Sequence, residues 1–148
     1  MAKTPLEIMN VYYDKLINKQ PDARDFVFGV WADHCILTFP GNHPFSGTFH
    51  AKSWQPDVYK AALKAKGVVD AKVKCFELAA DDKFAVSHYL EVFEFPGGEK
   101  LEADRFCIYG FENERVVSMR VIDLNPDAVN EFFNKHFASS PSDRCLHR

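Results

Sequence analysis

The sequence has no surplus of positive charge and no long apolar run. Of its 148 residues, 18 are Lys or Arg and 21 are Asp or Glu, so the formal net charge is −3 with His neutral. A nucleic-acid-binding domain would carry a basic stripe and a high isoelectric point, so this balance argues against one. No apolar segment approaches the roughly 20 residues that cross a bilayer, and residues 1–5 lack the apolar core of a signal peptide. We therefore expect a cytoplasmic protein with no nucleic-acid or membrane partner.

The motifs of several common enzyme classes are also missing. The four cysteines, Cys35, Cys75, Cys107 and Cys145, are isolated, which favours reduced and mostly buried thiols over a zinc site. The sequence contains no G-x-S-x-G, no P-loop, no G-x-G-x-x-G and no metal-ligand spacing. Serine hydrolysis, phosphoryl transfer and nicotinamide chemistry therefore have no support, and we expect no metal and no cofactor.

Apolar side chains are abundant. Hydrophobic residues make up 47% of the chain and aromatic residues 14%, with 14 Phe. This content supports a substantial core and leaves apolar side chains over to line a cavity. The sequence has no repeat, low-complexity segment or internal linker. We therefore expect one domain over residues 1–138 and a loose tail at 139–148.

Helical spacing and turn signals predict the order of elements. Thr4 and Glu7 predict a capping box, with Pro5 at the first helical position, for a helix that ends near Asn18, and a short helix from Asp22 follows. The apolar stripe of that second helix includes Trp31. The remaining predicted elements are strands at 35–39 and 46–50, a helix at 54–66, strands at 68–78, 84–95, 101–111 and 116–124, and a helix that follows Asn125 and carries Val129, Phe132, Phe133 and Phe137.

This order predicts an α+β fold. Long consecutive strands joined by short turns form an antiparallel meander, and helices pack against one side of it. We expect a strongly curved, mostly antiparallel sheet wrapped around three helices as an open cone, with a further C-terminal helix. The mouth of such a cone is a concave apolar site of the kind that binds small molecules.

The alternation of side chains along each strand assigns its two faces. In the strand 84–95, the set with Val86, His88 and Leu90 is the more apolar, so we predict that it faces the interior. In the strand 116–124, the set with Met119 and Asp123 is the more apolar, which predicts Asp123 near the cavity rim. In the strand 101–111 both faces are mixed.

His88 and Asp104 are the leading candidates for proton transfer. The turn at 96–98 pairs residues whose numbers sum to about 194, so these two should be near neighbours if both point inward. A His beside a carboxylate in an apolar cone can act as general acid and base. The alternative is a core His whose ring the carboxylate only orients.

Tyr13, the loop 39–45 and Trp54 can each be interpreted as functional or as structural. Tyr13, on the inner face of the first helix, can donate to a substrate oxygen or be satisfied within the core. The loop 39–45 can line an entrance or act as a rigid connector, and Trp54 can cover the mouth or serve only in packing. The expected lining of the cavity consists of Phe39, Trp54, Leu90, Phe106, Met119 and Asp123.

Several segments resemble the nuclear transport factor 2-like superfamily, in its SnoaL-like polyketide cyclase and ketosteroid isomerase branches. They are VYYDKL at 11–16, WADHC at 31–35, FPGNHPFSG at 39–47, ADRF at 103–106 and VVSMRV at 116–121. The resemblance runs from about Leu6 to Leu124. It implies a cystatin-like cone, a hydrophobic pocket and a homodimer that pairs through the outer sheet face, which would include Tyr89, Arg105, Tyr109 and Arg120.

The resemblance also implies roles for single residues. Tyr13 matches the tyrosine that donates to the substrate oxygen in ketosteroid isomerase, and Asp104 resembles the acid that shares this oxyanion hole. The general-base aspartate of that enzyme falls at Phe39, which cannot take a proton. His88 falls at an apolar pocket position, which would move acid–base work to His88 and Asp104.

Two functions are therefore expected. The first is cofactor-free proton transfer, of the isomerase, cyclase or dehydratase kind, on a small apolar molecule with a carbonyl or hydroxyl group. The alternative is a non-catalytic ligand-binding or association module with the same fold.

Overall fold

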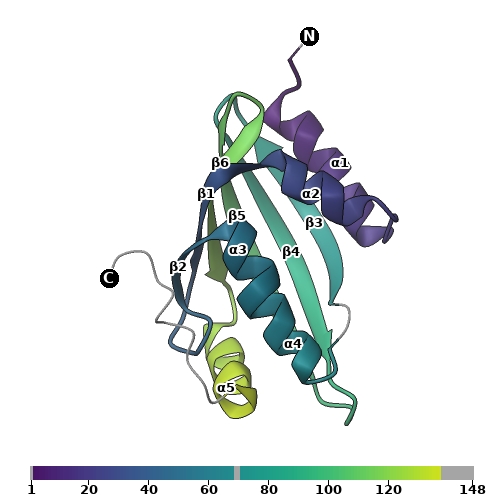
Figure 1. The fold of residues 1–148 in the computed structure, drawn as a ribbon, viewed down its shortest axis with the longest axis vertical. Coiled ribbons are helices and arrows are strands. Elements are labelled where there is room, and N and C mark those ends of the chain that lie inside the picture. The colour runs from purple at the N-terminus through teal and green to yellow at the C-terminus, as the bar shows by residue number, and fades with distance from the viewer. Residues whose placement is uncertain (1, 69–70, 138–148) are drawn as a thin grey trace.

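The computed structural model describes residues 2–68 and 71–137, which form one six-stranded sheet with helices packed against it (Figure 1). The elements are α1 (Pro5–Ile17), α2 (Ala23–Val30), β1 (Trp31–Phe39), β2 (Gly47–His50), α3 (Ala51–Trp54), the π-helical segment η1 (Gln55–Lys60), α4 (Ala61–Ala65), β3 (Lys72–Ala80), β4 (Phe84–Glu94), β5 (Lys100–Glu112), β6 (Arg115–Asp123) and α5 (Pro126–His136). The strand order is β2-β1-β6-β5-β4-β3, with β1 parallel to β6 and the other neighbours antiparallel. The predicted meander from β3 to β6 is confirmed. Within the described ranges no helix is long and apolar enough to cross a membrane.

Local sequence signals set most element boundaries. The predicted capping box of α1 is present, because the Thr4 side chain accepts from the Glu7 amide and the Glu7 carboxylate accepts from the Thr4 amide. The prediction for Trp31 was wrong: this residue begins β1, where it pairs with Val116 of β6. Tertiary pairing here overrides helical spacing. The third helical stretch also begins earlier than predicted, at Ala51, and the predicted tail at 139–148 lies outside the described residues.

The faces of β4 are the reverse of the prediction. The inward set is Ala85, Ser87, Tyr89, Glu91 and Phe93, whereas Val86, His88 and Leu90 lie on the outer face. Ser87 and Glu91 of the inward set can be buried because they are hydrogen-bonded or ion-paired with other interior side chains. On β5 the buried set contains Arg105 and Tyr109, so these two and Tyr89 are not on the outer face, whereas Arg120 is exposed. The inward placement of Met119 and Asp123 is confirmed.

Aromatic rings fill the space between the sheet and the helices in two groups. Tyr12, Tyr13, Tyr89 and Tyr109 pack together where α1 lies on the sheet. Towards the opposite end lies a larger group, formed by Phe39, Phe45, Phe49, Trp54, Tyr59, Phe93, Phe133 and Phe137. The expected hollow is therefore occupied largely by the chain's own rings.

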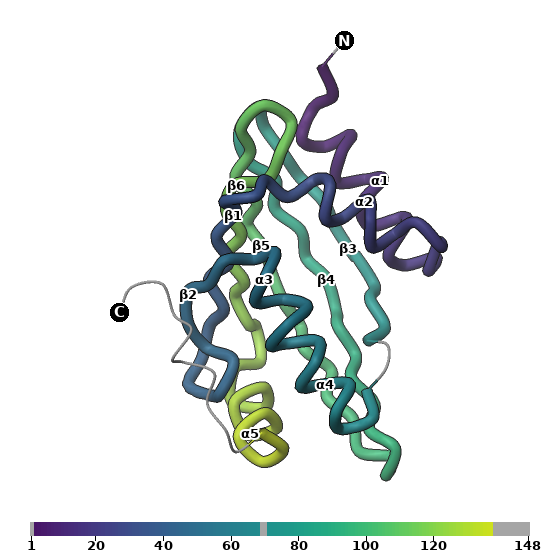
Figure 2. The backbone as a smooth tube through the Cα atoms, viewed as in Figure 1, coloured from purple at the N-terminus to yellow at the C-terminus, as the bar shows by residue number. Residues whose placement is uncertain are grey.

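Helix α5 lies at the end of the sheet away from α1 and α2 (Figure 2). Phe133 is fully buried, and its ring lies 4.9 Å from the His43 ring and 5.2 Å from the Phe45 ring. On the exposed side, Asn130 accepts from the Asn42 amide, and Asn134 donates to the Asn42 carbonyl. We refer to α5 in this position as the C-terminal cap.

We expect Phe133→Ala to lower the free energy of unfolding by about 3–5 kcal/mol, because it removes a fully buried ring from the centre of the cap. Urea unfolding monitored by fluorescence measures this change. Glu131→Ala, on the exposed side of the same helix, serves as the control and should change stability little. A loss below about 1 kcal/mol for Phe133→Ala would show that the cap is not part of the core.

Candidate functional site

A buried arginine holds two carboxylates at the centre of the sheet. The Arg105 side chain is 1% exposed; its Nη1 lies 2.7 Å from Glu91 Oε1, and its Nε lies 2.7 Å from Asp123 Oδ1. The register explains the arrangement, because Asp123 of β6 is directly opposite Arg105, and Glu91 follows two residues after its partner Tyr89 on β4. We call these three residues the Arg105 triad.

The groups around Arg105 keep its guanidinium charged. Burial alone lowers the pKa of Arg105, but the surrounding acidic and phenolic groups raise it well above its ordinary value. The guanidinium also lies 4.8 Å from the centre of the Phe39 ring, a cation–π contact. Arg105 is therefore a permanent positive charge in the interior of the protein.

Four buried polar atoms around the triad lack a hydrogen bond of good geometry among the described residues, although Arg105 is close enough to the Tyr59 hydroxyl, and the Pro40 backbone to the His43 ring, to influence the pKa of Tyr59 and of His43. They are Arg105 Nη2, the Tyr59 hydroxyl, Trp54 Nε1 and His43 Nε2. All four side chains contact the ring of Phe39, at 4.8 Å from the Arg105 guanidinium carbon and 5.3–5.9 Å from the rings of Tyr59, Trp54 and His43. We call Arg105, Tyr59, Trp54 and His43 the donor cluster.

A π-helical segment positions two members of the donor cluster. Trp54 ends α3 and Tyr59 lies within η1, five residues later. The wider turn of a π-helix brings residues at this spacing onto one face, and such segments are frequent at functional sites. The two rings consequently stack, with centroids 5.2 Å apart and planes 15° from parallel. Both polar atoms are thereby held inside the cone.

A tight loop fixes the protonation of His43. Its Nδ1 accepts a hydrogen bond from the Phe45 amide at 3.1 Å, and its own amide donates to Ser46 Oγ. Burial, with a smaller contribution from the charge of Arg105, lowers its pKa to about 4. The ring is therefore neutral near pH 7, and Nε2 carries the proton. The loop 39–45 was expected either to line an entrance or to act as a rigid connector. In the structure, its His43 and Phe39 side chains lie inside the cone.

Tyr13 belongs to a separate network whose polar groups are satisfied. Its hydroxyl lies 2.8 Å from Ser87 Oγ and 2.6 Å from the Tyr109 hydroxyl. Burial raises the pKa of Tyr13 and of Tyr109 well above the ordinary value, so both phenols stay neutral. The inward position predicted for Tyr13 is confirmed, and it lies in the tyrosine group rather than in the donor cluster.

His88 and Asp104 meet, but on the outer face of the sheet. Their side chains are joined at 2.7 Å between Nε2 and Oδ1, and they are 27% and 42% exposed. His88 is directly opposite Phe106, so paired residues sum to 194, as predicted. The inward orientation on which their role in the cone depended was wrong. The rings of Phe76 and Phe106 flank the imidazole at 4.9 and 5.0 Å.

The other predicted lining residues divide between the two faces. Phe39, Trp54, Met119 and Asp123 are inside, and Phe39 and Asp123 contact Arg105 directly. Leu90 and Phe106 are half-buried on the outer face, so their prediction as interior lining was wrong. They share that face with His88, because both strands alternate in register.

Sequence reasoning missed Glu91, Arg105 and Tyr59 as site residues. A signal was present for the first two. Arg105 is opposite in charge to Glu91 and Asp123, and the three residues lie at neighbouring register positions on three consecutive strands. Tyr59 had no such signal, because its direction depends on the π-helical segment.

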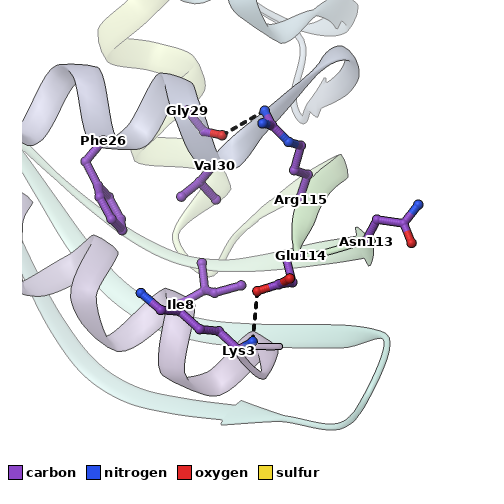
Figure 3. Close-up of a pocket in the computed structure, with 8 residues that line it drawn as sticks. All are labelled: Lys3, Ile8, Phe26, Gly29, Val30, Asn113, Glu114 and Arg115. Carbon is purple, nitrogen blue, oxygen red and sulfur yellow. Dashed lines mark hydrogen bonds between the residues drawn. The ribbon is translucent and has the colours of Figure 1, made fainter. Parts of the chain in front are cut away.

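Two surface hollows lie near the β5–β6 turn. One, of about 360 Å³, is lined by residues that include Ile8, Phe26 and Arg115 (Figure 3). The other, of about 330 Å³, is adjacent and shares Asn113 and Arg115 with it. No residue of the Arg105 triad or the donor cluster lines either hollow. Within the described residues, no group of three or more His, Cys, Asp or Glu side chains could hold a metal ion.

Comparison with solved structures identifies the architecture. A protein of unknown function with a cystatin-like fold from Xanthomonas campestris superposes with a TM-score of 0.74, at 14% identity over 88% of this chain and 98% of that one. A protein from a soil-derived mobile gene cassette gives 0.73, at 15% identity over 86% and 95%. A protein designated a SnoaL-like polyketide cyclase from a Jannaschia species gives 0.59, at 15% identity over 84% and 91%. The chain has the cystatin-like fold of these proteins, which is also the fold of nuclear transport factor 2-like proteins. No protein-family model and no curated protein matches it.

The depressed pKa of His43 makes stability depend on pH. The unfolded chain binds a proton near pH 6.5, whereas the folded protein binds it near pH 4, so stability falls as the pH drops through this window. Between pH 7 and pH 4.5 we expect His43 to account for a loss of about 2–3 kcal/mol.

Urea unfolding of the wild type and of His43→Asn at both pH values measures this loss. The asparagine side chain can still accept from the Phe45 amide but does not titrate. The wild type should lose more stability than the variant, and equal losses would contradict a neutral buried His43.

Proposed function

We propose that the protein binds a small, mainly apolar molecule next to Arg105, where the aromatic rings that fill the cone must move apart to admit it. The observation that carries the proposal is the donor cluster, whose four side chains contact one aromatic ring and each have a buried polar atom without a hydrogen bond of good geometry. A buried polar atom without a partner costs about 1–3 kcal/mol, and native proteins contain few of them. A bound molecule with acceptor atoms would satisfy this cluster, and the aromatic walls would contact its apolar part.

Similarity to known proteins supports a binding function in this fold. TerC, which was co-crystallised with polyporic acid, superposes with a TM-score of 0.70 at 11% identity over 87% of this chain and 97% of that one. The protein designated a SnoaL-like polyketide cyclase has the same architecture. A shared fold does not assign an activity, so the donor cluster remains the main argument.

The proposal concerns binding rather than turnover. His88 and Asp104 are on the outer face, and the inward carboxylates of Glu91 and Asp123 are both paired with Arg105. Tyr13 is hydrogen-bonded within the tyrosine group. The acid–base groups expected for a cyclase or isomerase therefore do not converge in the interior.

Tyr59→Phe should weaken binding while changing the stability of the free protein little. It removes a buried hydroxyl whose contact with Arg105 falls short of a hydrogen bond of good geometry, so we expect the free energy of unfolding to change by less than about 1 kcal/mol. We expect affinity for 2-acetylnaphthalene, an apolar ketone used as the probe, to fall about tenfold, because a hydrogen bond to the ketone oxygen is lost. Urea unfolding and isothermal titration calorimetry measure the two quantities.

Tyr13→Phe is the matched control, because it removes a hydroxyl that is already hydrogen-bonded. It should lower stability and leave probe affinity unchanged. The proposal fails if the wild type does not bind the probe, or if both variants change affinity equally.

A second candidate function is self-association through the outer sheet face. Phe76, Phe84, Val86 and Ile122 lie on this face and are each more than a third exposed. An exposed apolar patch of this kind is typical of an interaction surface, and a two-fold axis would place the same patch of a second copy against it. We propose that the chain forms a homodimer through these residues.

Val86→Lys should convert the dimer into a monomer, because it places a charge at the centre of this patch. Sedimentation velocity measures the change. Val11→Lys introduces the same charge at an equally exposed position, 39% against 38%, on α1 and should leave the dimer intact. A monomeric wild type, or a dimeric Val86→Lys variant, would exclude this interface.

A further inference from the structure

A surface hollow of about 360 Å³ lies where α1, the end of α2 and the β5–β6 turn meet (Figure 3). Ile8 of α1 and Val30 of α2 point toward each other across it, and Phe26 of α2 lies beside them. Ile8 and Val30 are buried and Phe26 is half-buried, so part of the hollow has apolar walls. We call this place the α1–α2 hollow. Its volume falls within the range of sites for small organic molecules, roughly 300–1,000 Å³.

Gly29 leaves open space beside the α1–α2 hollow. It lies in the last turn of α2, where glycine is less favourable than alanine because it loses more conformational freedom on folding. A Cβ added to Gly29 would meet no atom within 4 Å. Packing against the described residues therefore does not require glycine here, and its effect is to keep this space empty.

The β5–β6 turn, which forms another wall, also departs from the preferred sequence of its type. Asn113 and Glu114 have φ values of 50° and 64°, the left-handed conformation of a two-residue hairpin turn. Glycine is the usual second residue of such a turn, and a glutamate is strained there. The Glu114 carboxylate accepts from the Lys3 amide at 2.8 Å and so holds the N-terminal segment beside the hollow. Gly29 and Glu114 are thus two locally unfavourable choices that line one hollow, as is expected at a functional site.

Arg115 supplies this hollow with a positive charge that has no ion-pair partner among the described residues. Its Nη1 donates to the Gly29 carbonyl at 3.1 Å, which fixes the guanidinium at the C-terminal end of α2. Asp33 is already paired with Lys52, which lowers the pKa of this carboxyl more than the charge of Arg115 does. The other N–H groups of the Arg115 guanidinium are therefore available to bind a carboxylate.

Of the two surface hollows near this turn, the α1–α2 hollow is the more positive. Lys3 and Arg115 line it together with one acidic residue, Glu114, whose carboxylate is hydrogen-bonded to the Lys3 amide. The adjacent hollow shares Arg115 but is lined by Glu112 and has no lysine. In a chain with a net charge of −3, the α1–α2 hollow thus combines apolar walls with local positive charge.

We propose that the α1–α2 hollow binds a small carboxylate with an apolar body, such as an arylalkanoate. The carboxylate accepts from the free N–H groups of Arg115, and Lys3 adds a second positive charge. The apolar body lies against Ile8, Phe26 and Val30. No residue of the donor cluster lines this hollow, so the inference does not depend on the proposed function.

4-Phenylbutyrate and its neutral amide, 4-phenylbutanamide, test the need for a negative charge. The two compounds have similar size and shape and differ in the charge of one end group. We expect the wild type to bind the carboxylate about tenfold more tightly at low ionic strength, and added salt to reduce the difference because the charges are screened. Isothermal titration calorimetry measures both affinities. Equal affinities, or no binding of 4-phenylbutyrate, overturn the proposal.

Arg115→Gln tests the partner of the carboxylate. It should lower the affinity for 4-phenylbutyrate about tenfold and leave that for the amide unchanged, because only the carboxylate forms a charge-assisted pair. Arg120→Gln removes the same charge from an exposed position of the same strand and should leave both affinities unchanged. Equal losses in the two variants would reflect the net charge of the protein and would contradict a site at Arg115.

Gly29→Leu tests the hollow itself. It places a side chain in the open space, and leucine is the better helix former, so the urea midpoint should not fall while 4-phenylbutyrate affinity falls at least about tenfold. Gly97→Leu is the matched control, because a Cβ at this exposed turn position also meets no atom within 4 Å. Wild-type affinity in Gly29→Leu would exclude the hollow as the site.

Protein-observed NMR of the wild type separates this site from the donor cluster. 4-Phenylbutyrate should shift the amide signals of Gly29 and Glu114 and leave the indole N–H signal of Trp54 unchanged. The reverse pattern would place the compound at the donor cluster and overturn the present inference while supporting the proposed function.

Discussion

The burial of Arg105 constrains the rest of the structure. An isolated charge in a protein interior is very unfavourable, and removing one partner of a buried pair typically costs about 3–5 kcal/mol, a large part of a domain's stability. Arg105 can be buried only because Glu91 and Asp123 approach it from the strands on either side. The register of three strands and the identity of the inward face of each are therefore fixed together.

The two groups of interior side chains differ in whether their polar atoms are hydrogen-bonded. In the tyrosine group, the hydroxyls of Tyr13 and Tyr109 are hydrogen-bonded to each other. In the donor cluster, four polar atoms are equally buried and lack a hydrogen bond of good geometry among the described residues. The first arrangement is typical of a structural core and the second of a recognition site. The two arrangements lie a few residues apart along β5, and the second supports the proposed binding site.

The sequence predicted the order of elements, the meander and the strand pairing at 96–98, because helix caps, turns and short connections are local signals. It also predicted that Met119 and Asp123 face inward. The inward face of β4 was predicted wrongly because the prediction took the alternating set with more apolar side chains as the buried one. Counting fails when a buried charge is neutralised by residues on other strands, as Glu91 is by Arg105. The outer face of β4 is the more aliphatic of the two, so its composition resembled that of a core.

The C-terminal cap has a consequence for the rate at which the proposed ligand would exchange. Phe133 and Phe137 of the cap region contact Phe45 at the end of the cone, so a route through that end requires α5 to move. Such opening limits association and dissociation to the frequency of a protein motion rather than to diffusion. A tightly held molecule would then survive dilution and chromatography, and it would be found in the purified protein by mass spectrometry of an organic extract.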